Sequence, residues 1–207
     1  MGESDRQTKT KNKTMKHKKL PELKFLEECF ELSSESPSGI QWKKERPSSH
    51  FKTLRGWRIW SSQFAGKYAG NIHSSGNEYK HWEVRIAGSL YKAHRLVYML
   101  ANKVDPGDLE VDHIDGDAKN NNPCNLRLAN HIENGHNRSK NRNNKSGHKG
   151  VSWYANLRKW VAEIMVDGKR KRLGCFDLLE DAANAYKEQS LLLHKTFSPF
   201  ATANINA

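Results

Sequence analysis

The sequence contains no apolar run long enough to cross a bilayer. Apolar stretches such as Leu191–Leu193 are far shorter than the roughly 20 residues that a membrane-spanning helix needs. The first twenty residues are polar and basic and lack the apolar segment of a secretory signal. We therefore expect an intracellular protein without a membrane partner.

Cysteine is also scarce. Cys29, Cys124 and Cys175 are odd in number and widely spaced, and no two of them form a Cys-x-x-Cys pair. This usage argues against a disulfide framework and against a zinc site built on thiolates. It agrees with an intracellular location.

Acidic residues are outnumbered, with 23 Asp and Glu against 35 Lys and Arg and a formal net charge of +12. The excess is concentrated: residues 138–172 contain eleven Lys and Arg and two acids, whereas residues 105–117 contain six acids and no Lys or Arg. Basic surface neutralises phosphates, and clustered carboxylates attract divalent cations. The pattern indicates a metal-dependent enzyme acting on nucleic acid, and a solvated charged surface is the alternative.

The length of 207 residues allows one domain or two small ones. Composition predicts a disordered basic tail over residues 1–21 and a basic linker over 138–149. These segments delimit a first domain over 22–137 and a second over 150–201. The expected fold class is α+β.

The first domain is expected to begin with a helix and to contain a hairpin that leads into a second helix. Residues 102–137 carry several turn signals and little apolar material, so this long polar segment is typical of a functional site. The expected elements are a helix over 23–32, a strand over 40–44, irregular chain over 45–55, a hairpin over 82–92 and a helix over 93–101.

The second domain has a regular pattern of three strands and one helix. Strands are expected over 150–154, 159–166 and 169–176, with an Asp167-Gly168 hairpin turn, and Asp177 with Glu180 indicates the start of a helix that runs to about His194. Alternation in the middle strand directs one set of side chains toward the helix and the other to an open face. The first set is Trp160, Ala162 and Ile164, and the second is Lys159, Val161, Glu163 and Met165.

Residues 109–138, LEVDHIDGDAKNNNPCNLRLANHIENGHNR, are dense in His, Asp and Asn. This segment resembles the HNH endonuclease motif. Its three elements correspond to Asp112-His113, to Asn125 and to Asn134, separated by twelve and nine residues. The resemblance implies a small ββα-metal nuclease core. The chain upstream, from about residue 22, resembles the region before the motif in phage HNH proteins, including homing endonucleases.

The resemblance also implies a role for each residue of the motif. His113 would be the general base that deprotonates water, and Asn125 would position His113 or its loop. Asp112 and Asn134 would hold one divalent ion, Mg²⁺ or Mn²⁺.

Several neighbours compete for these assignments. Asn122 is an alternative to Asn125, and both His136 and Asn137 are alternatives to Asn134. The other histidines near the motif have ordinary explanations. His94 is expected to be structural, and His131 to be structural or a phosphate contact.

The second domain resembles the plant APETALA2, or ethylene-response-factor, DNA-binding domain. The matching segments are SGHKGV (146–151), KWVAEI (159–164), LGCF (173–176) and EDAANAY (180–186). In that family the sheet enters the major groove and the helix braces its back. The expected DNA contacts of the sheet and the basic linker are Arg138, Lys140, Arg142, Lys149, Lys159, Glu163, Arg170 and Arg172.

Two departures limit this resemblance. Ser152 and Met165 stand where the plant domains usually have arginine, so their base preference does not transfer.

Taken together, the two resemblances predict a metal-dependent DNA endonuclease of the phage or mobile-element homing type. Its partner would be double-stranded DNA, and it would act as a monomer or weak dimer in the cytoplasm of a host cell. The alternative is a non-catalytic, sequence-specific DNA-binding regulator. An RNA-binding module is less favoured because stacking surfaces of exposed aromatics are not evident.

Overall fold

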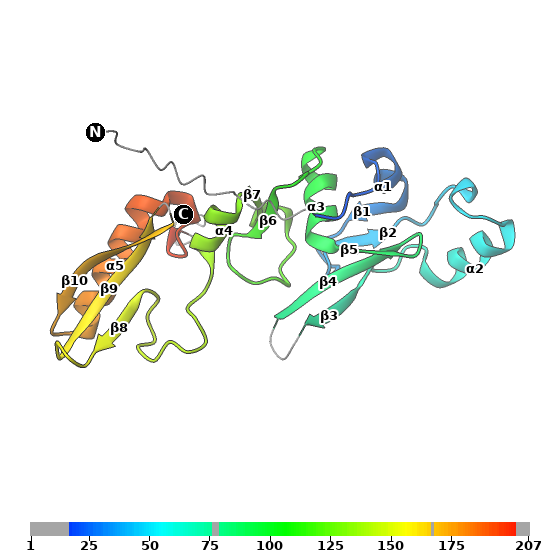
Figure 1. The fold of residues 1–207 in the computed structure, drawn as a ribbon. Coiled ribbons are helices and arrows are strands. Elements are labelled where there is room, and N and C mark those ends of the chain that lie inside the picture. Colours follow the sequence, from blue (N-terminus) through cyan, green and yellow to red (C-terminus); the bar gives the residue numbers. More distant parts are fainter. Residues whose placement is uncertain (1–16, 76–78, 167, 202–207) are drawn as a thin grey trace, which may run out of the picture.

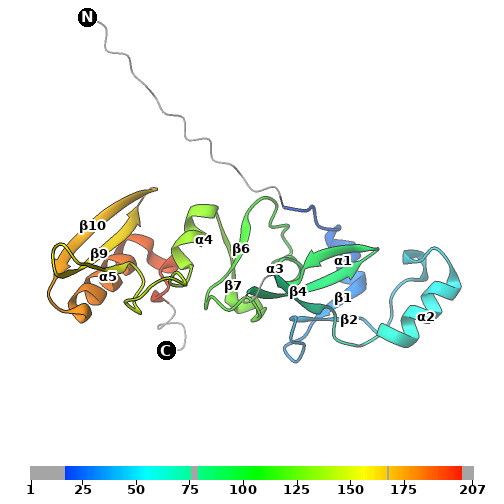
Figure 2. The same ribbon diagram turned by 60° about the horizontal axis from the view of Figure 1, so that its bottom comes forward.

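The computed structural model describes residues 17–75, 79–166 and 168–201 (Figure 1). Most of the expected N-terminal tail and Asp167 of the expected hairpin turn lie outside the described residues. The elements follow one another along an elongated molecule, with the N-terminal helices and strands at one end and the C-terminal sheet and helix at the other (Figures 1 and 2).

The N-terminal end begins with helix α1 (Leu23–Cys29), followed by the antiparallel strands β1 (Phe30–Leu32) and β2 (Ile40–Trp42). The expected helix over 23–32 is therefore too long. It ends at Cys29 because Phe30 is extended and pairs with Trp42 across the two strands. Phe30 and Ile40 are buried in the core, so burial against β2 outweighs the helical spacing of the sequence.

Helix α2 (Leu54–Phe64) follows a single 3-10 turn, η1 (Ser48–His50). The sequence predicted irregular chain over 45–55, and this is wrong for η1 and for residues 54–55, where α2 begins. Thr53 starts α2, because its hydroxyl oxygen accepts a hydrogen bond from the Gly56 amide at 3.1 Å. No residue of α2 is fully buried.

A three-stranded antiparallel sheet comes next, in the order β3 (Asn71–Ser75), β4 (Tyr79–Ile86) and β5 (Ser89–Lys92). The predicted hairpin over 82–92 is confirmed as β4 and β5. Its two-residue turn has positive φ at both central positions, 46° at Ala87 and 81° at Gly88, which matches the right-handed twist of the strands.

Helix α3 (Ala93–Asn102) is the centre of the N-terminal two thirds of the chain, and it confirms the predicted helix over 93–101. It contacts α1, both neighbouring sheets and the strands β6 (Glu110–His113) and β7 (Leu126–Ala129). Leu96 and Val97 are fully buried in one hydrophobic cluster that extends to Val111 and Leu126. The N-terminal elements and the β6–β7 hairpin therefore share a single core.

The C-terminal elements form a separate core. The predicted strands and helix are confirmed as β8 (Val151–Tyr154), β9 (Lys159–Val166), β10 (Lys169–Phe176) and α5 (Leu179–His194), followed by the short turn η3 (Lys195–Phe197). The strand order is β10-β9-β8, and buried residues of β8, β9 and α5 form the cluster. These residues are Val151, Ala162, Ile164, Ala182 and Tyr186.

Two details of this region differ from expectation. Val161, assigned to the open face, is 1% exposed; it lies between Ser152 of β8 and Cys175 of β10. Asp177 does not cap α5; Leu178 holds that position without a side-chain cap, and Asp177 pairs with Lys159 at 3.1 Å.

Gly150 fixes the approach of β8 to α5. Its φ is +72°, and a Cβ there would lie 2.1 Å from the ring of Tyr186. Only glycine allows both this backbone conformation and this close contact.

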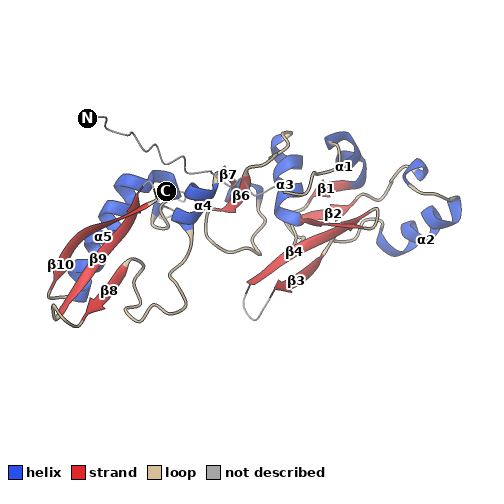
Figure 3. Cartoon of the chain, viewed as in Figure 1, coloured by secondary structure: helices blue, strands red, loops and turns tan. Residues whose placement is uncertain are grey.

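The architecture confirms the predicted α+β class, with small antiparallel sheets and packed helices (Figure 3). Within the described residues, no helix is both long and apolar enough to cross a bilayer.

Candidate active site

The residues of the Asp112-His113 segment lie on β6, which pairs with β7 and packs against helix α4 (His131–Asn137). Figure 2 shows β6 and β7 between α4 and α3. A capping box starts α4. The Asn130 side chain accepts from two amides of the first turn, and the Glu133 carboxylate accepts from the Asn130 amide at 2.8 Å. The helix is thereby fixed relative to the end of β7.

Asp112 is a buried carboxylate, only 6% exposed, with a full set of donors. Arg127, directly opposite on β7, donates to Oδ2 from Nη2 at 2.7 Å and from Nε at 2.9 Å. The Asn137 amide nitrogen lies 3.1 and 3.2 Å from the two carboxylate oxygens and 2.7 Å from the His113 carbonyl oxygen. Asp112 therefore joins β6, β7 and α4.

Asn134, the predicted third element, lies one turn earlier on α4 and meets a different carboxylate. Its amide donates to Glu110, which also bonds the His131 ring at 2.9 Å. Burial acts to raise the pKa of Glu110, but the hydrogen bonds from His131 and Asn134 outweigh it and leave that pKa below its usual value. Of the three candidates on α4, Asn137 is the one that contacts Asp112.

His136, the other alternative to Asn134 as the third element of the motif, lies where α4 meets the C-terminal helix α5. Its ring stacks on that of His194, with centroids 3.7 Å apart and planes within 7°.

His113 is 7% exposed and sits at the end of β6. Its Nε2 lies 2.9 Å from Oδ1 of Asn121, and its ring meets the His94 ring edge-on with centroids 5.1 Å apart. Burial first, and the neighbouring His113 second, hold the pKa of His94 well below its usual value. His94 is therefore a neutral packing partner of His113 near neutral pH.

Asn125 does not contact His113. Its amide nitrogen donates to Asp115 and to the Asn120 carbonyl, both at 2.9 Å, and its oxygen accepts from the Asp115 amide at 3.1 Å. Asn125 thus closes the loop between β6 and β7. Its competitor Asn122 caps the short turn η2 (Pro123–Asn125) by accepting from Cys124.

Two residues at the site were not found from the sequence. Asn121 is the side chain that meets His113, but it lies in an Asn-rich run where the spacing gives no reason to choose it. Arg127 donates to the Thr196 carbonyl, and its guanidinium lies 4.1 Å from the Phe197 ring centroid. That contact spans 69 residues of sequence, and no local pattern signals it.

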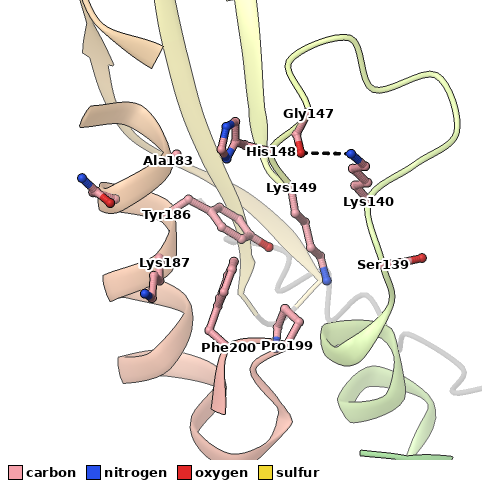
Figure 4. A pocket seen from close by; sticks show the side chains of 11 residues that line it. Ser139, Lys140, Gly147, His148, Lys149, Ala183, Tyr186, Lys187, Pro199 and Phe200 are labelled. Carbon is pink, nitrogen blue, oxygen red and sulfur yellow. Dashed lines mark hydrogen bonds between the residues drawn. The ribbon is translucent and has the colours of Figure 1, made fainter. Parts of the chain in front are cut away.

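Lys149, which the sequence predicted to contact DNA, binds the end of α4 in this structure. Its ammonium donates to the His136 carbonyl at 2.7 Å and to the Arg138 carbonyl, at the C-terminal end of α4. Burial, and secondarily Arg138, lower the pKa of Lys149 to about 8. Its side chain enters the same pocket as Tyr186 and Phe200 (Figure 4). Lys149 thus links α4 to the C-terminal core.

The open face of the C-terminal sheet keeps exposed cations. Glu163 accepts from Arg170 at 3.5 Å and from Arg172 at 3.4 Å, and the Arg172 guanidinium lies 5.2 Å from the Tyr154 ring centroid. Arg170 and Arg172 remain 69% and 48% exposed. The predicted linker contacts Arg138, Lys140 and Arg142 are exposed as well.

The oxygens near Asp112 suit a hard cation. No group of three or more His, Cys, Asp or Glu side chains within the described residues is arranged to hold a metal ion. The Asp112 carboxylate offers oxygen ligands, whereas the adjacent Asn137 amide faces it with its nitrogen. That amide would present its oxygen to a cation only after a rotation that gives up its hydrogen bond to the His113 carbonyl. Oxygen ligands are those that Mg²⁺ and Mn²⁺ take, and Mg²⁺ keeps several waters.

Comparison with known proteins identifies the region around this site. Residues 91–136 match a family described as HNH endonuclease. Protein 3.8 of Escherichia phage T7 is 37% identical over 113 residues, which are 53% of this chain and 93% of that protein. The uncharacterized HNH endonuclease L560 of Acanthamoeba polyphaga mimivirus is 33% identical over 113 residues, 54% of this chain and 56% of that protein. The chain thus spans about half the length of the mimivirus protein. No solved structure matches the chain.

The buried ammonium of Lys149 predicts a pH-dependent stability. Between about pH 8 and 10.5, the unfolded chain keeps this proton while the folded chain releases it, so the free energy of unfolding should rise with pH. We expect the unfolding free energy of the wild type to rise over this window relative to that of Lys149→Met. Urea unfolding followed by tryptophan fluorescence measures both. Lys145→Met, which removes an exposed lysine of the same linker, is the control. Parallel pH curves for wild type and Lys149→Met would contradict the prediction.

Proposed function

Because this chain belongs to the HNH endonuclease family, we propose that it is a metal-dependent DNA endonuclease of the phage homing type. The family implies nuclease activity. The observation that carries the proposal for this chain is the convergence of Asp112, His113 and Asn137 at one end of β6. Phosphodiester hydrolysis needs a base for the attacking water beside a centre that neutralises the developing negative charge.

We assign the role of general base to His113, because imidazole accepts protons near neutral pH. The loop closed by Asn125 carries Asn121 to the His113 ring, so Asn125 acts on the base through the loop. Arg127 neutralises Asp112 from the opposite strand and keeps a cation next to the site.

Nucleases of this family generally depend on a divalent metal. We propose that Mg²⁺ or Mn²⁺ binds at Asp112 with Asn137 as the second protein ligand, since its amide is the one adjacent to that carboxylate. When bound there, the ion would stabilise charge on the phosphate and on the leaving 3'-oxygen. Asn134, the ligand predicted from the sequence, remains the alternative.

We further propose that the C-terminal module binds double-stranded DNA as APETALA2-type domains do. Support comes from the exposed Arg170 and Arg172 on the open face and from the exposed linker cations Arg138, Lys140 and Arg142. The proposed division is a nuclease domain over 22–137, a linker over 138–149 and a DNA-binding domain over 150–201. A monomeric or weakly dimeric state, in the cytoplasm of a host cell, remains a prediction from the sequence.

A non-catalytic DNA-binding regulator is the second candidate. One observation favours it: both N–H groups of Arg127 that face Asp112 bind the same carboxylate oxygen, as in a structural ion pair. A regulator would keep this pair in every state, whereas a nuclease must let the carboxylate accept a cation.

Substitution of His113 separates these two candidates. His113→Ala should slow the nicking or linearisation of supercoiled plasmid by about 10²–10⁴-fold, because the attacking water loses its base. Affinity for DNA should remain within about twofold, measured by fluorescence anisotropy. Chelation of the metal should stop the wild-type reaction. His73→Ala, an exposed histidine in β3, is the control. A wild-type protein that binds plasmids but never cuts them would support the regulator.

Paired substitutions on α4 test the second metal ligand. Asn137→Ala should raise the Mn²⁺ concentration for half-maximal cleavage by about tenfold or more, because one of two protein ligands is lost. Asn134→Ala removes an equivalent side-chain amide, which faces Glu110 instead of Asp112. It should change the half-maximal Mn²⁺ concentration by less than about threefold. Mn²⁺ binding followed by electron paramagnetic resonance checks the same order without cleavage. The reverse order would assign the ligand to Asn134.

The proposed DNA-binding face is tested by removing charges from the open face of the sheet and, as a control, from helix α5 behind it. Arg170→Ala and Arg172→Ala should each lower the slope of log Kd against log salt by about 0.9, if each meets one phosphate. Lys187→Ala removes an exposed charge from α5, behind the sheet, and should leave the slope unchanged. These substitutions are preferable to deleting the module, since η3 contacts Arg127 and Lys149 binds α4. If Arg170→Ala and Arg172→Ala keep the same slope as Lys187→Ala, DNA binds to another surface.

A further inference from the structure

We propose that Asn121 is a positioning residue for His113, and that it ties the general base to the backbone of the N-terminal elements. The inference rests on the proposed function, in which His113 is that base. Its basis is a chain of two hydrogen bonds through one buried amide: His113 Nε2 to Asn121 Oδ1 at 2.9 Å, and Asn121 Nδ2 to the Ser38 carbonyl at 3.0 Å.

The chemistry of the three partners sets the direction of both bonds. The Ser38 carbonyl oxygen can only accept, so the amide nitrogen of Asn121 must face it. The amide oxygen then faces His113, and Nε2 must be the donor. In the neutral ring this assigns the proton to Nε2 and leaves the lone pair on Nδ1. Asn121 thus selects which nitrogen of His113 can take a proton from water.

The connection lies entirely inside the protein. His113, Asn121 and Ser38 are 7%, 3% and 1% exposed. Water therefore competes poorly for these bonds, and a buried polar group that loses its partner bears the full cost of desolvation. The ring orientation is consequently set by the protein rather than by solvent.

The far end of the connection is held rigidly. The Ser38 hydroxyl donates to the Ala69 carbonyl, and the neighbouring Ser36 hydroxyl donates to the Ile40 carbonyl at 2.7 Å. Gly39, with φ +84°, lies so close to Asn121 that a Cβ at Gly39 would be 2.8 Å from the backbone carbonyl oxygen of Asn121. The chain around residue 38 therefore serves as a fixed reference point for the base.

Asn121 differs in this from its neighbours in the same loop. Asn120 and Asn125 both bind Asp115 and hold the loop closed, but neither contacts His113. The three asparagines thus offer a matched comparison between a residue that orients the base and residues that maintain the loop.

The first experiment compares Asn121→Ala with Asn120→Ala in the full-length protein. Single-turnover cleavage at saturating DNA should fall about 10–100-fold for Asn121→Ala, since a small misplacement of a reacting group costs about that much. The Kd for DNA should stay within about twofold. Asn120→Ala should lower the melting temperature without a comparable loss of rate. Equal rate losses for the two variants would reduce Asn121 to a loop residue and overturn the proposal.

The second experiment uses a background that lacks the base. In His113→Gly, with imidazole added to the buffer, cleavage no longer depends on how the protein orients residue 113. Adding Asn121→Ala to His113→Gly should therefore leave the residual rate, with or without imidazole, unchanged within about twofold. A further loss as large as that caused in the wild type would show that Asn121 supports the fold and not the base.

A spectroscopic measurement tests the tautomer without any cleavage. The imidazole ¹⁵N and ¹H spectrum of His113 in wild type should show the proton on Nε2, and Asn121→Ala should show a mixture of tautomers. A mixture already present in the wild type would overturn the proposal. If wild type has the Nε2–H form but does not cut DNA, the proposed function fails while the hydrogen-bond chain stands.

Discussion

The burial of one carboxylate organises much of this protein. Asp112 is nearly inaccessible to water, and an ionised carboxylate in such a place is tolerated only with strong donors around it. Arg127 and Asn137 supply these donors from β7 and α4. The same Arg127 also contacts the Thr196 carbonyl and the Phe197 ring, so this ion pair connects the Asp112 region to η3.

The two hydrophobic cores are joined by polar contacts. One core packs around α3 and includes the β6–β7 hairpin, and the other lies between the C-terminal sheet and α5. The junction consists of the Arg127 contacts, the stacked His136 and His194 rings, and the Lys149 ammonium at the end of α4. A basic segment that reads as a simple linker therefore ends in a lysine that holds the modules together. The orientation of the C-terminal sheet relative to His113 is set by these contacts.

The site itself is assembled from three directions. The hairpin supplies Asp112 and His113, α4 supplies the amides, and the N-terminal elements supply the Ser38 carbonyl that fixes Asn121. Arg95 on α3 adds to this, because its guanidinium donates to the Gly107 carbonyl at 2.6 Å and the Leu109 carbonyl at 2.7 Å, just before β6. The upstream region is thus part of the scaffold that places His113.

The sequence by itself determined the elements whose signals are local. The hairpin with its Ala87-Gly88 turn, helix α3 and the three C-terminal strands with α5 follow from alternation, turn residues and helical periodicity. The adjacency of Asp112 and His113 was also evident, since neighbours in a strand stay neighbours in space. Helix α2 was missed although Trp57, Trp60 and Phe64 recur at helical spacing and Thr53 caps its first turn.

Tertiary structure alone decided which side chains meet across long stretches of chain. It placed Asn137 rather than Asn134 at Asp112, brought Asn121 to His113 and turned Lys149 toward α4. Residue type and spacing cannot distinguish one asparagine from the next in such a run. The choice depends on the packing of α4 and of the N-terminal elements against β6, where a buried donor or acceptor must find a partner.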